Sequence, residues 1–192
     1  MKSCLTSREI SKYDDIILSK SIKNNKNILF PKDFILGTST SSYQVEGSNY
    51  ECNWSVFEKK HKLSNNIGTG SWLYFEQEVS LMKNLGINSY RMSLEWARIV
   101  PKPYIINNKV LKKYHNQIKF LIRNNIKPLI TLHHFTRPSW LDNKYGGLHN
   151  DKIIPHFLFY AKTVANKYKN EVTYWNTFNE PMLECVNGYI TG

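Results

Sequence analysis

The stretch YWNTFNEP, which runs from Tyr174 to Pro181, decides the fold of this chain. Aromatic and β-branched residues dominate its first part, and this composition suits a pleated β-strand. A proline cannot donate a hydrogen bond to a sheet, so we expect the strand to end at Asn179-Glu180. Parallel sheets and barrels carry their chemistry at the carboxyl ends of their strands. The stretch therefore predicts Asn179 and Glu180 at the mouth of a pocket.

The pair Asn179-Glu180 has two interpretations. A carboxylate beside a carboxamide that can read hydroxyl groups suits acid–base chemistry on a polyol. The alternative is a glutamate that ends a strand and caps the following helix. The stretch alone leaves both interpretations open.

Composition places the chain among globular proteins. Its 192 residues are most simply one domain, and a hydrophobic content of 41% is enough for a sizeable core. The formal net charge of +11 would suit a nucleic-acid partner. The lysines, however, are scattered among asparagines and isoleucines, and the sequence has no arginine-rich block. We therefore expect no nucleic-acid partner.

The cysteines indicate a reducing compartment. Cys4, Cys52 and Cys185 are odd in number, far apart and without a CxxC pair, so neither a disulfide framework nor a zinc site is expected. Residues 1–20 hold no apolar run of the signal-peptide kind, and the longest apolar stretches are too short to span a bilayer. We expect a cytoplasmic protein with no membrane association and no cofactor.

Strands and helices are expected to alternate along most of the chain. Residues 1–28 are polar and are expected to form an appended arm, with a short helix over Asp14–Ser19. Hydrophobic periodicity then predicts strands followed by helices, with Ser71 as an N-cap and Gly86 as a helix stop. The predicted strands are Phe30–Gly37, Ile87–Leu94, Lys127–His133 and Glu171–Asn179, and the predicted helices are Asn53–Lys60, Trp72–Leu85, Val110–Asn125 and Asp151–Tyr168.

This spacing is typical of parallel βα units. Two consecutive strands end in His133-His134 and Asn179-Glu180, and Arg91 lies near the end of the strand before them. In a barrel these strand ends converge on one mouth. An open doubly wound sheet fits the same pattern, although no GxGxxG follows the first strand.

Gln44 is the one long amide in a loop of small hydroxyl residues, Thr38–Gly47. It can donate and accept hydrogen bonds, so it is a candidate ligand for a polar substrate. The alternative is a turn amide that bonds within its own loop. Local evidence does not separate these interpretations.

Five segments in order resemble glycoside hydrolase family 1, the β-glucosidase family of clan A. The resemblance is collinear and covers roughly residues 28–192. The segments are Phe30–Gly37, the end of the serine-rich loop at Tyr43–Gly47, Tyr90–Ile99, Thr131–Phe135 and Trp175–Pro181.

The resemblance implies an α/β fold, with residues 29–192 as the N-terminal half of a (β/α)₈ TIM barrel, strands 1–4 with their helices. It also implies hydrolysis of β-O-glycosidic bonds with retention of configuration. By this resemblance Glu180 is the general acid/base. The substrate-binding residues are Asn179 at the sugar 2-hydroxyl, Gln44 and His134 at the glycone hydroxyls, and Arg91 beside the nucleophile carboxylate.

Three further residues near these segments are expected to be structural. His133 and His134 face opposite ways on a strand, and by alignment His134 faces the sugar, so His133 is expected to be packed. Glu46 resembles a structural position of the family. Glu95 does not match the family nucleophile.

A retaining glycosidase needs two carboxylates about 5–5.5 Å apart. In the family the nucleophile follows the seventh strand, and the last residues here resemble the segment just after the fourth. We therefore expect the chain to be truncated after strand 4 and to have little or no activity alone. The alternatives are a 6-phospho-β-glycosidase, a non-catalytic remnant that binds sugar, and a split enzyme whose second chain carries the C-terminal half-barrel.

Overall fold

The computed structural model describes residues 30–47 and 50–190. The polar arm expected at residues 1–28 and the short helix expected over Asp14–Ser19 lie outside the described residues. Everything below concerns the described part of the chain.

The chain divides into two units, residues 1–34 and 35–192. The described end of the first unit is a turn, in which the backbone N–H of Phe34 donates to the carbonyl of Pro31 at 2.9 Å. The rings of Phe30 and Phe34 stack with their centroids 4.4 Å apart. The second unit carries the sheet and its helices.

Four parallel strands form one sheet in the order β1-β2-β3-β4. Neighbours in the sequence are therefore neighbours in the sheet. A doubly wound sheet reverses its strand order at a switch point, whereas a barrel keeps one direction around its axis. The observed order favours the barrel. The strands are β1 Gly37–Ser39, β2 Ser89–Ser93, β3 Lys127–His133 and β4 Tyr174–Phe178.

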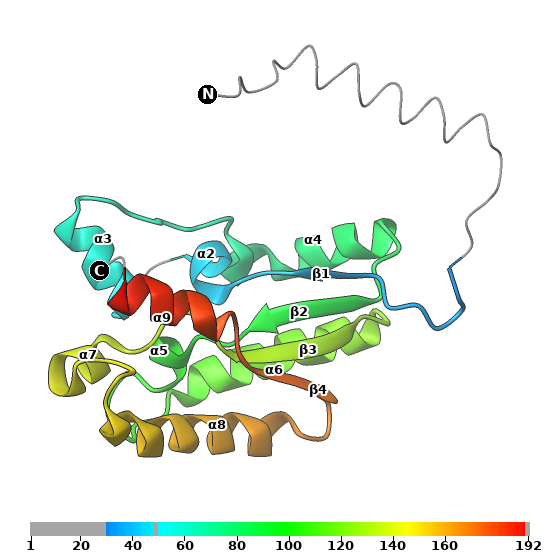
Figure 1. Cartoon of the computed structure of the whole chain (residues 1–192). Helices are drawn as coiled ribbons and strands as arrows, with labels where there is room; N and C mark the ends of the chain where they lie inside the picture. Colours follow the sequence, from blue (N-terminus) through cyan, green and yellow to red (C-terminus); the bar gives the residue numbers. More distant parts are fainter. Residues whose placement is uncertain (1–29, 48–49, 191–192) are drawn as a thin grey trace, which may run out of the picture. The chain divides into compact units, whose positions relative to one another are not determined.

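Long helices flank the sheet, and short helices gather at the carboxyl ends of its strands (Figure 1). The long helices are α4 Ser71–Asn84, α6 Asn108–Arg123 and α8 Ile154–Tyr168, the last preceded by the 3₁₀ turn η1 Asp151–Ile153. The others are α2 Ser42–Glu46, α3 Asn53–Lys60, α5 Trp96–Ile99, α7 Ser139–Tyr145 and α9 Pro181–Tyr189.

The first strand lies further along the chain than predicted. It was expected at Phe30–Gly37, but β1 comprises Gly37–Ser39. Pro31 cannot donate to a sheet and opens a turn, and the parallel register with β2 begins only at Gly37. The expected hydroxyl loop consequently starts inside a strand. Its second half is the helix α2, so Gln44 lies on a helix and not on a loop.

The start of α4 also differs from the prediction. Ser71 was expected to be the N-cap, but Gly70 takes that place in the left-handed conformation, with φ 79°. Ser71 is the first helical residue, and its hydroxyl donates to Glu78 Oε2 at 2.6 Å. The helix stop at Gly86 is confirmed, since Gly86 has φ 74° directly after the C-cap Leu85.

The core fills the space between the sheet and the helices α4, α6 and α8. Trp96 and Tyr160 stack in it at 5.3 Å, and both are fully buried. The Tyr160 hydroxyl lies 2.9 Å from the carbonyl of Leu94 and 3.0 Å from that of Leu132, so its proton joins the ends of β2 and β3. This hydrogen bond stabilises the carboxyl edge of the sheet, where the polar candidate residues lie.

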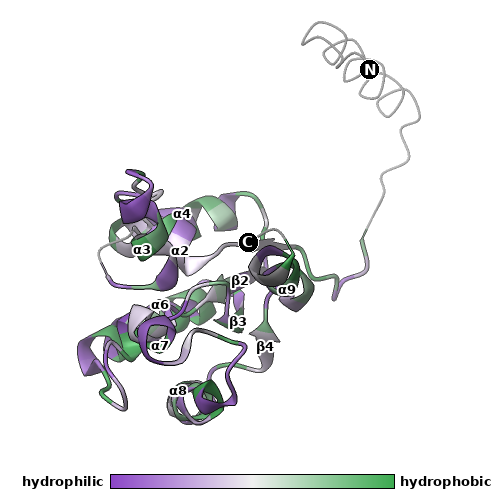
Figure 2. Ribbon diagram, turned by 60° about the vertical axis from the view of Figure 1, so that its left-hand side comes forward, coloured by the Kyte–Doolittle hydropathy of each residue, from purple (hydrophilic) through white to green (hydrophobic). Residues whose placement is uncertain are grey.

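Strands β1 and β4 are the edges of the described sheet. Large apolar side chains are exposed on the elements beside them, and Figure 2 shows apolar residues on α8 and α9. The exposed apolar side chains include Leu73, Leu81 and Leu85 near β1, and Leu158, Tyr174 and Met182 near β4. In the described part of the chain no helix has both the length and the apolar character needed to cross a membrane.

We predict that Tyr160→Phe lowers the free energy of unfolding by about 1–2 kcal/mol, because two buried carbonyls lose their shared donor. Urea unfolding followed by circular dichroism measures this change. Tyr74→Phe on α4 is the matched control, because Tyr74 is half exposed. Equal midpoints for the two variants would show that the Tyr160 hydroxyl does not brace the sheet.

Candidate active site

Arg91 and Asn179 meet at the carboxyl edge of the sheet. Arg91 comes from β2, and its Nη1 donates to Asn179 Oδ1 at 3.2 Å. Asn179 directly follows β4 and is only 6% exposed. Its backbone N–H donates to the carbonyl of His133 at 2.9 Å, which extends the β3–β4 ladder by one residue. The structure therefore brings together two of the residues that the sequence singled out.

Glu180 occupies the corner between β4 and α9. Its backbone is left-handed, with φ 46° and ψ 57°, a conformation that costs a non-glycine residue about 1–2 kcal/mol. It stands at the N-cap position of α9, but its side chain makes no capping hydrogen bond. The helix-cap interpretation of Glu180 is therefore wrong. The residue is exposed, in a strained backbone of the kind that gathers at functional sites.

His134 and Gln44 line one cavity of about 200 Å³. Gln44 projects from α2 and is exposed, whereas His134 follows β3 and is partly buried. Burial, together with the nearby charges of Arg91 and His133, lowers the pKa of His134 to about 4. His134 is therefore neutral at neutral pH, and a neutral imidazole both donates and accepts hydrogen bonds.

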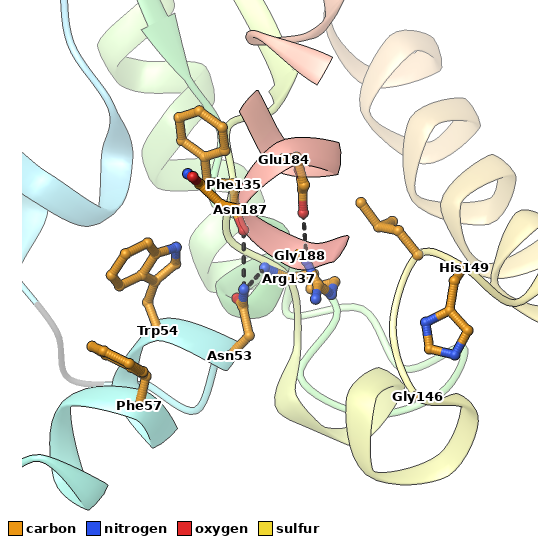
Figure 3. Close-up of a pocket in the computed structure, with 11 residues that line it drawn as sticks. Asn53, Trp54, Phe57, Phe135, Arg137, Gly146, His149, Glu184, Asn187 and Gly188 are labelled. Carbon is orange, nitrogen blue, oxygen red and sulfur yellow. Dashed lines mark hydrogen bonds and ion pairs between the residues drawn. The ribbon is translucent and has the colours of Figure 1, made fainter. Parts of the chain in front are cut away.

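A second cavity of about 320 Å³ lies beside the first and shares Trp54 and Phe135 with it. Figure 3 shows Trp54 and Phe57 on one side of this cavity, with Arg137 and Glu184 across from them. The rings of Trp54 and Phe57 pack edge to face at 5.5 Å. One wall is thus aromatic and the other carries charged groups.

The interpretation of His133 as a packed residue is confirmed. It is fully buried, and its Nε2 lies 2.8 Å from Glu184 Oε2. Sequence reasoning missed Glu184 and its second partner Arg137, whose Nη1 donates to Glu184 Oε1 at 2.6 Å. The available signal was spacing, because Glu184 lies four residues after Glu180 and so on the same helix face.

Glu46 is structural, as expected. Its carboxylate pairs with Arg98 at 3.2 Å and accepts a hydrogen bond from the Tyr114 hydroxyl at 2.9 Å. Burial raises the pKa of the Glu46 carboxyl, and the Arg98 guanidinium opposes that rise. The residue is 7% exposed and is held away from solvent.

Glu95 is also committed to the structure. It is fully buried, and it accepts hydrogen bonds from Thr136 at 2.7 Å and Ser42 at 3.0 Å. Its Oε1 accepts the backbone N–H of Ala97 at 3.1 Å and so caps α5. Burial raises the pKa of this carboxyl. Within residues 30–47 and 50–190 no group of three His, Cys, Asp or Glu side chains could hold a metal ion.

Sequential parallel βα units with polar side chains at their carboxyl edge are the arrangement of an enzyme of the (β/α)₈ barrel class. Comparison with known proteins supports this class. The family model described as glycosyl hydrolase family 1 matches residues 26–192. The beta-glycosidase from Pyrococcus horikoshii superposes with a TM-score of 0.80 and 36% identity, over 84% of this chain and 38% of that protein.

Two curated plant proteins are similar at the same level. Beta-glucosidase 47 of Arabidopsis thaliana is 35% identical over 195 residues, which cover 94% of this chain and 36% of the relative. Beta-glucosidase 12 of Oryza sativa subsp. indica is 36% identical over 177 residues, or 85% of this chain and 35% of the relative. The chain belongs to glycosyl hydrolase family 1. It spans about a third of the length of these curated relatives.

We predict that His134 titrates near pH 4, well below an ordinary histidine, and that Arg91→Gln moves this midpoint upward by removing a nearby positive charge. Because the folded-state pKa is lowered, the unfolded chain takes up this proton first. His134 therefore contributes a loss of stability as the pH falls from 6.5 towards 4.

The titration is measured from the imidazole carbon-bound proton by NMR, with His134→Gln assigning the signal. A midpoint near 6.5 in the folded chain would contradict the burial of this side chain.

Proposed function

We propose that this chain supplies the acid/base half of a retaining β-glycosidase, which hydrolyses β-O-glycosidic bonds of the β-glucosidase kind. The observation that carries the proposal is the arrangement at the end of β4. Arg91 Nη1 donates to Asn179 Oδ1 at 3.2 Å. Glu180 follows Asn179 directly; its backbone is left-handed and its carboxylate is exposed. The cavity lined by Gln44 and His134 takes the sugar.

In this mechanism Glu180 first protonates the leaving oxygen and later deprotonates the attacking water. Asn179 reads the sugar 2-hydroxyl. The Arg91 guanidinium donates to Asn179 Oδ1, and this contact fixes the amide so that its Nδ2 faces away from Arg91 and is available as a donor. Neutral His134 and Gln44 hold glycone hydroxyls, because each can both donate and accept.

The leaving group occupies the second cavity. That cavity adjoins the sugar cavity through Trp54 and Phe135. Its aromatic wall, made by Trp54 and Phe57, suits the flat face of a sugar or aryl ring. The proposed binding partner of this chain is thus its substrate, a β-glycoside or an oligosaccharide.

The second carboxylate, which forms the glycosyl–enzyme intermediate, lies outside the described residues in this proposal. Glu46, Glu95 and Glu184 are each engaged by partners in the structure. The other half of the barrel supplies the nucleophile, either from the same polypeptide or from a second chain. A cytoplasmic location, with neither nucleic acid nor membrane as partner, remains our expectation.

We predict that the chain alone turns over no aryl β-glucoside, whereas a barrel completed with the C-terminal half of the Pyrococcus horikoshii beta-glycosidase does. In the completed barrel Glu180→Gln lowers kcat/KM by about 10²–10⁴-fold, because the departing oxygen is no longer protonated. The loss is greater for poor leaving groups than for a dinitrophenyl group, which departs without a proton. Glu76→Gln on the exposed surface of α4 is the control.

Azide provides an independent readout of the acid/base role. In the completed barrel with Glu180→Gly, azide replaces the water that Glu180 would activate and yields a β-glycosyl azide. An unchanged rate in Glu180→Gln would exclude Glu180 as the acid/base. Parallel assays with a 6-phospho-β-glucoside test the phosphorylated alternative, which is the correct one if only that substrate is hydrolysed.

We predict that Phe57→Ala in the completed barrel raises KM for an aryl β-glucoside by about tenfold, since a stacked ring contributes about 0.5–1.5 kcal/mol beyond its buried area. Phe57 lines the leaving-group cavity and not the sugar cavity. Inhibition by free glucose, which fills only the sugar cavity, stays within twofold. Phe30→Ala, in the other of the two units of the chain, is the matched aromatic control. An equal effect on glucose and aryl glucoside would contradict the placement of the leaving group against Phe57.

A further inference from the structure

Glu184 is bound on both carboxylate oxygens. Oε2 accepts from His133 Nε2 at 2.8 Å, and Oε1 accepts from Arg137 Nη1 at 2.6 Å. Its side chain is 18% exposed. Glu184 lies one turn after Glu180 on α9, and its backbone N–H points to the Glu180 carbonyl at 3.4 Å. Glu184, whose carboxylate is bound by two partners, therefore lies one helical turn after the proposed acid/base residue.

His133 contacts the corner between β4 and α9 through both its backbone and its ring. Its carbonyl accepts the backbone N–H of Asn179 at 2.9 Å, while its ring binds Glu184. The ring is fully buried, with Phe178 at 4.9 Å and Trp96 at 6.4 Å between centroids, so its orientation is fixed. Nδ1 is buried without a partner, and this assigns the proton to Nε2, which donates to Glu184.

Arg137 connects α9 to the neighbouring helices. Its Nε donates to Asp142 Oδ1 of α7 at 2.7 Å, and its Nη1 donates to Glu184, as the dashed line in Figure 3 marks. Its backbone N–H donates to Asn53 Oδ1, the first residue of α3, at 2.9 Å. The first turns of α9 are therefore anchored on elements that do not belong to β4.

The corner needs such an anchor because its backbone is strained. Glu180 is left-handed, and no side-chain cap holds the start of α9. A strained residue persists only where its surroundings over-determine it. The contacts that flank Glu180 are the Asn179–His133 bond before it and the two bonds of Glu184 after it.

We propose that Glu184 is a positioning residue: by binding His133 and Arg137 it fixes the first turns of α9 and so sets the place of the Glu180 carboxylate. The inference rests on the proposed function of Glu180. Glu184 acts through Glu180, because both of its oxygens are already engaged. Glu184→Gln keeps the shape of the side chain but turns an NH₂ group towards one of the two donors.

The first test needs no activity. Amide hydrogen exchange by NMR on the chain itself reports the Asn179 N–H and the amides of α9. We expect Glu184→Gln to speed exchange at Asn179 by about tenfold. Asp142→Asn removes the other carboxylate on Arg137 but leaves Glu184 bound, and it serves as the matched control, with exchange at Asn179 within twofold of the parent chain.

The second test uses the completed barrel. A misplacement of about 1 Å at a reacting group can cost about 10²-fold in rate. We expect Glu184→Gln to lower kcat by about 10- to 100-fold with KM within twofold, and more strongly for poor leaving groups. Glu184→Asp, which keeps the charge, recovers part of the rate and serves as the milder variant if Glu184→Gln does not fold.

Three results overturn the inference: unchanged exchange at Asn179 in Glu184→Gln, an equal effect of Asp142→Asn, or an unchanged kcat in Glu184→Gln while Glu180→Gln is inactive. If Glu180→Gln itself keeps full activity, the proposed function fails instead. In that case exchange at Asn179 still decides whether Glu184 holds the corner.

Discussion

The parallel pairing of β3 with β4 is the constraint on which the candidate site depends. The ladder continues one residue beyond β4, where the Asn179 N–H donates to the carbonyl of His133, the last residue of β3, at 2.9 Å. This bond sets Asn179 within reach of Arg91 on β2, and it turns the chain into the left-handed corner at Glu180. Residues from three strands thus meet because a single register places their ends together.

Much of the fold was predictable from the sequence. The strand Lys127–His133 was predicted with its observed bounds because a nearly continuous apolar run reflects burial directly. The bounds of α3 were also predicted, although Ser55 is its only buried residue. The βα spacing predicted parallel strands but left a barrel and an open doubly wound sheet both possible, and the family resemblance implied the barrel. The convergence of Arg91 and Asn179 was also accessible, since both residues stand near strand ends in the sequence.

The remaining features depend on tertiary contacts that leave no local pattern. β1 is formed by Gly37–Ser39 because it pairs with β2, although the apolar residues lie just before it. The Glu184–Arg137 pair joins residues 47 apart, and neither looks exceptional in its own segment. The left-handed backbone at Glu180 is likewise invisible in the sequence, because a glutamate carries no preference for it. Features imposed from a distance need coordinates to be found.

The carboxylates around the candidate site support the proposal that the described residues supply one half of a two-carboxylate mechanism. Glu46 is in an ion pair with a buried arginine, Glu95 is saturated by hydroxyl and backbone donors, and Glu184 holds a histidine and an arginine. To attack a sugar carbon, each would leave buried donors unpaired, which costs more than the bonds contributed. Of these four glutamates only Glu180 is exposed, and its side chain makes no hydrogen bond that caps α9. In the proposed function the chemistry of this half is therefore proton transfer, and covalent catalysis uses a carboxylate from beyond the described residues.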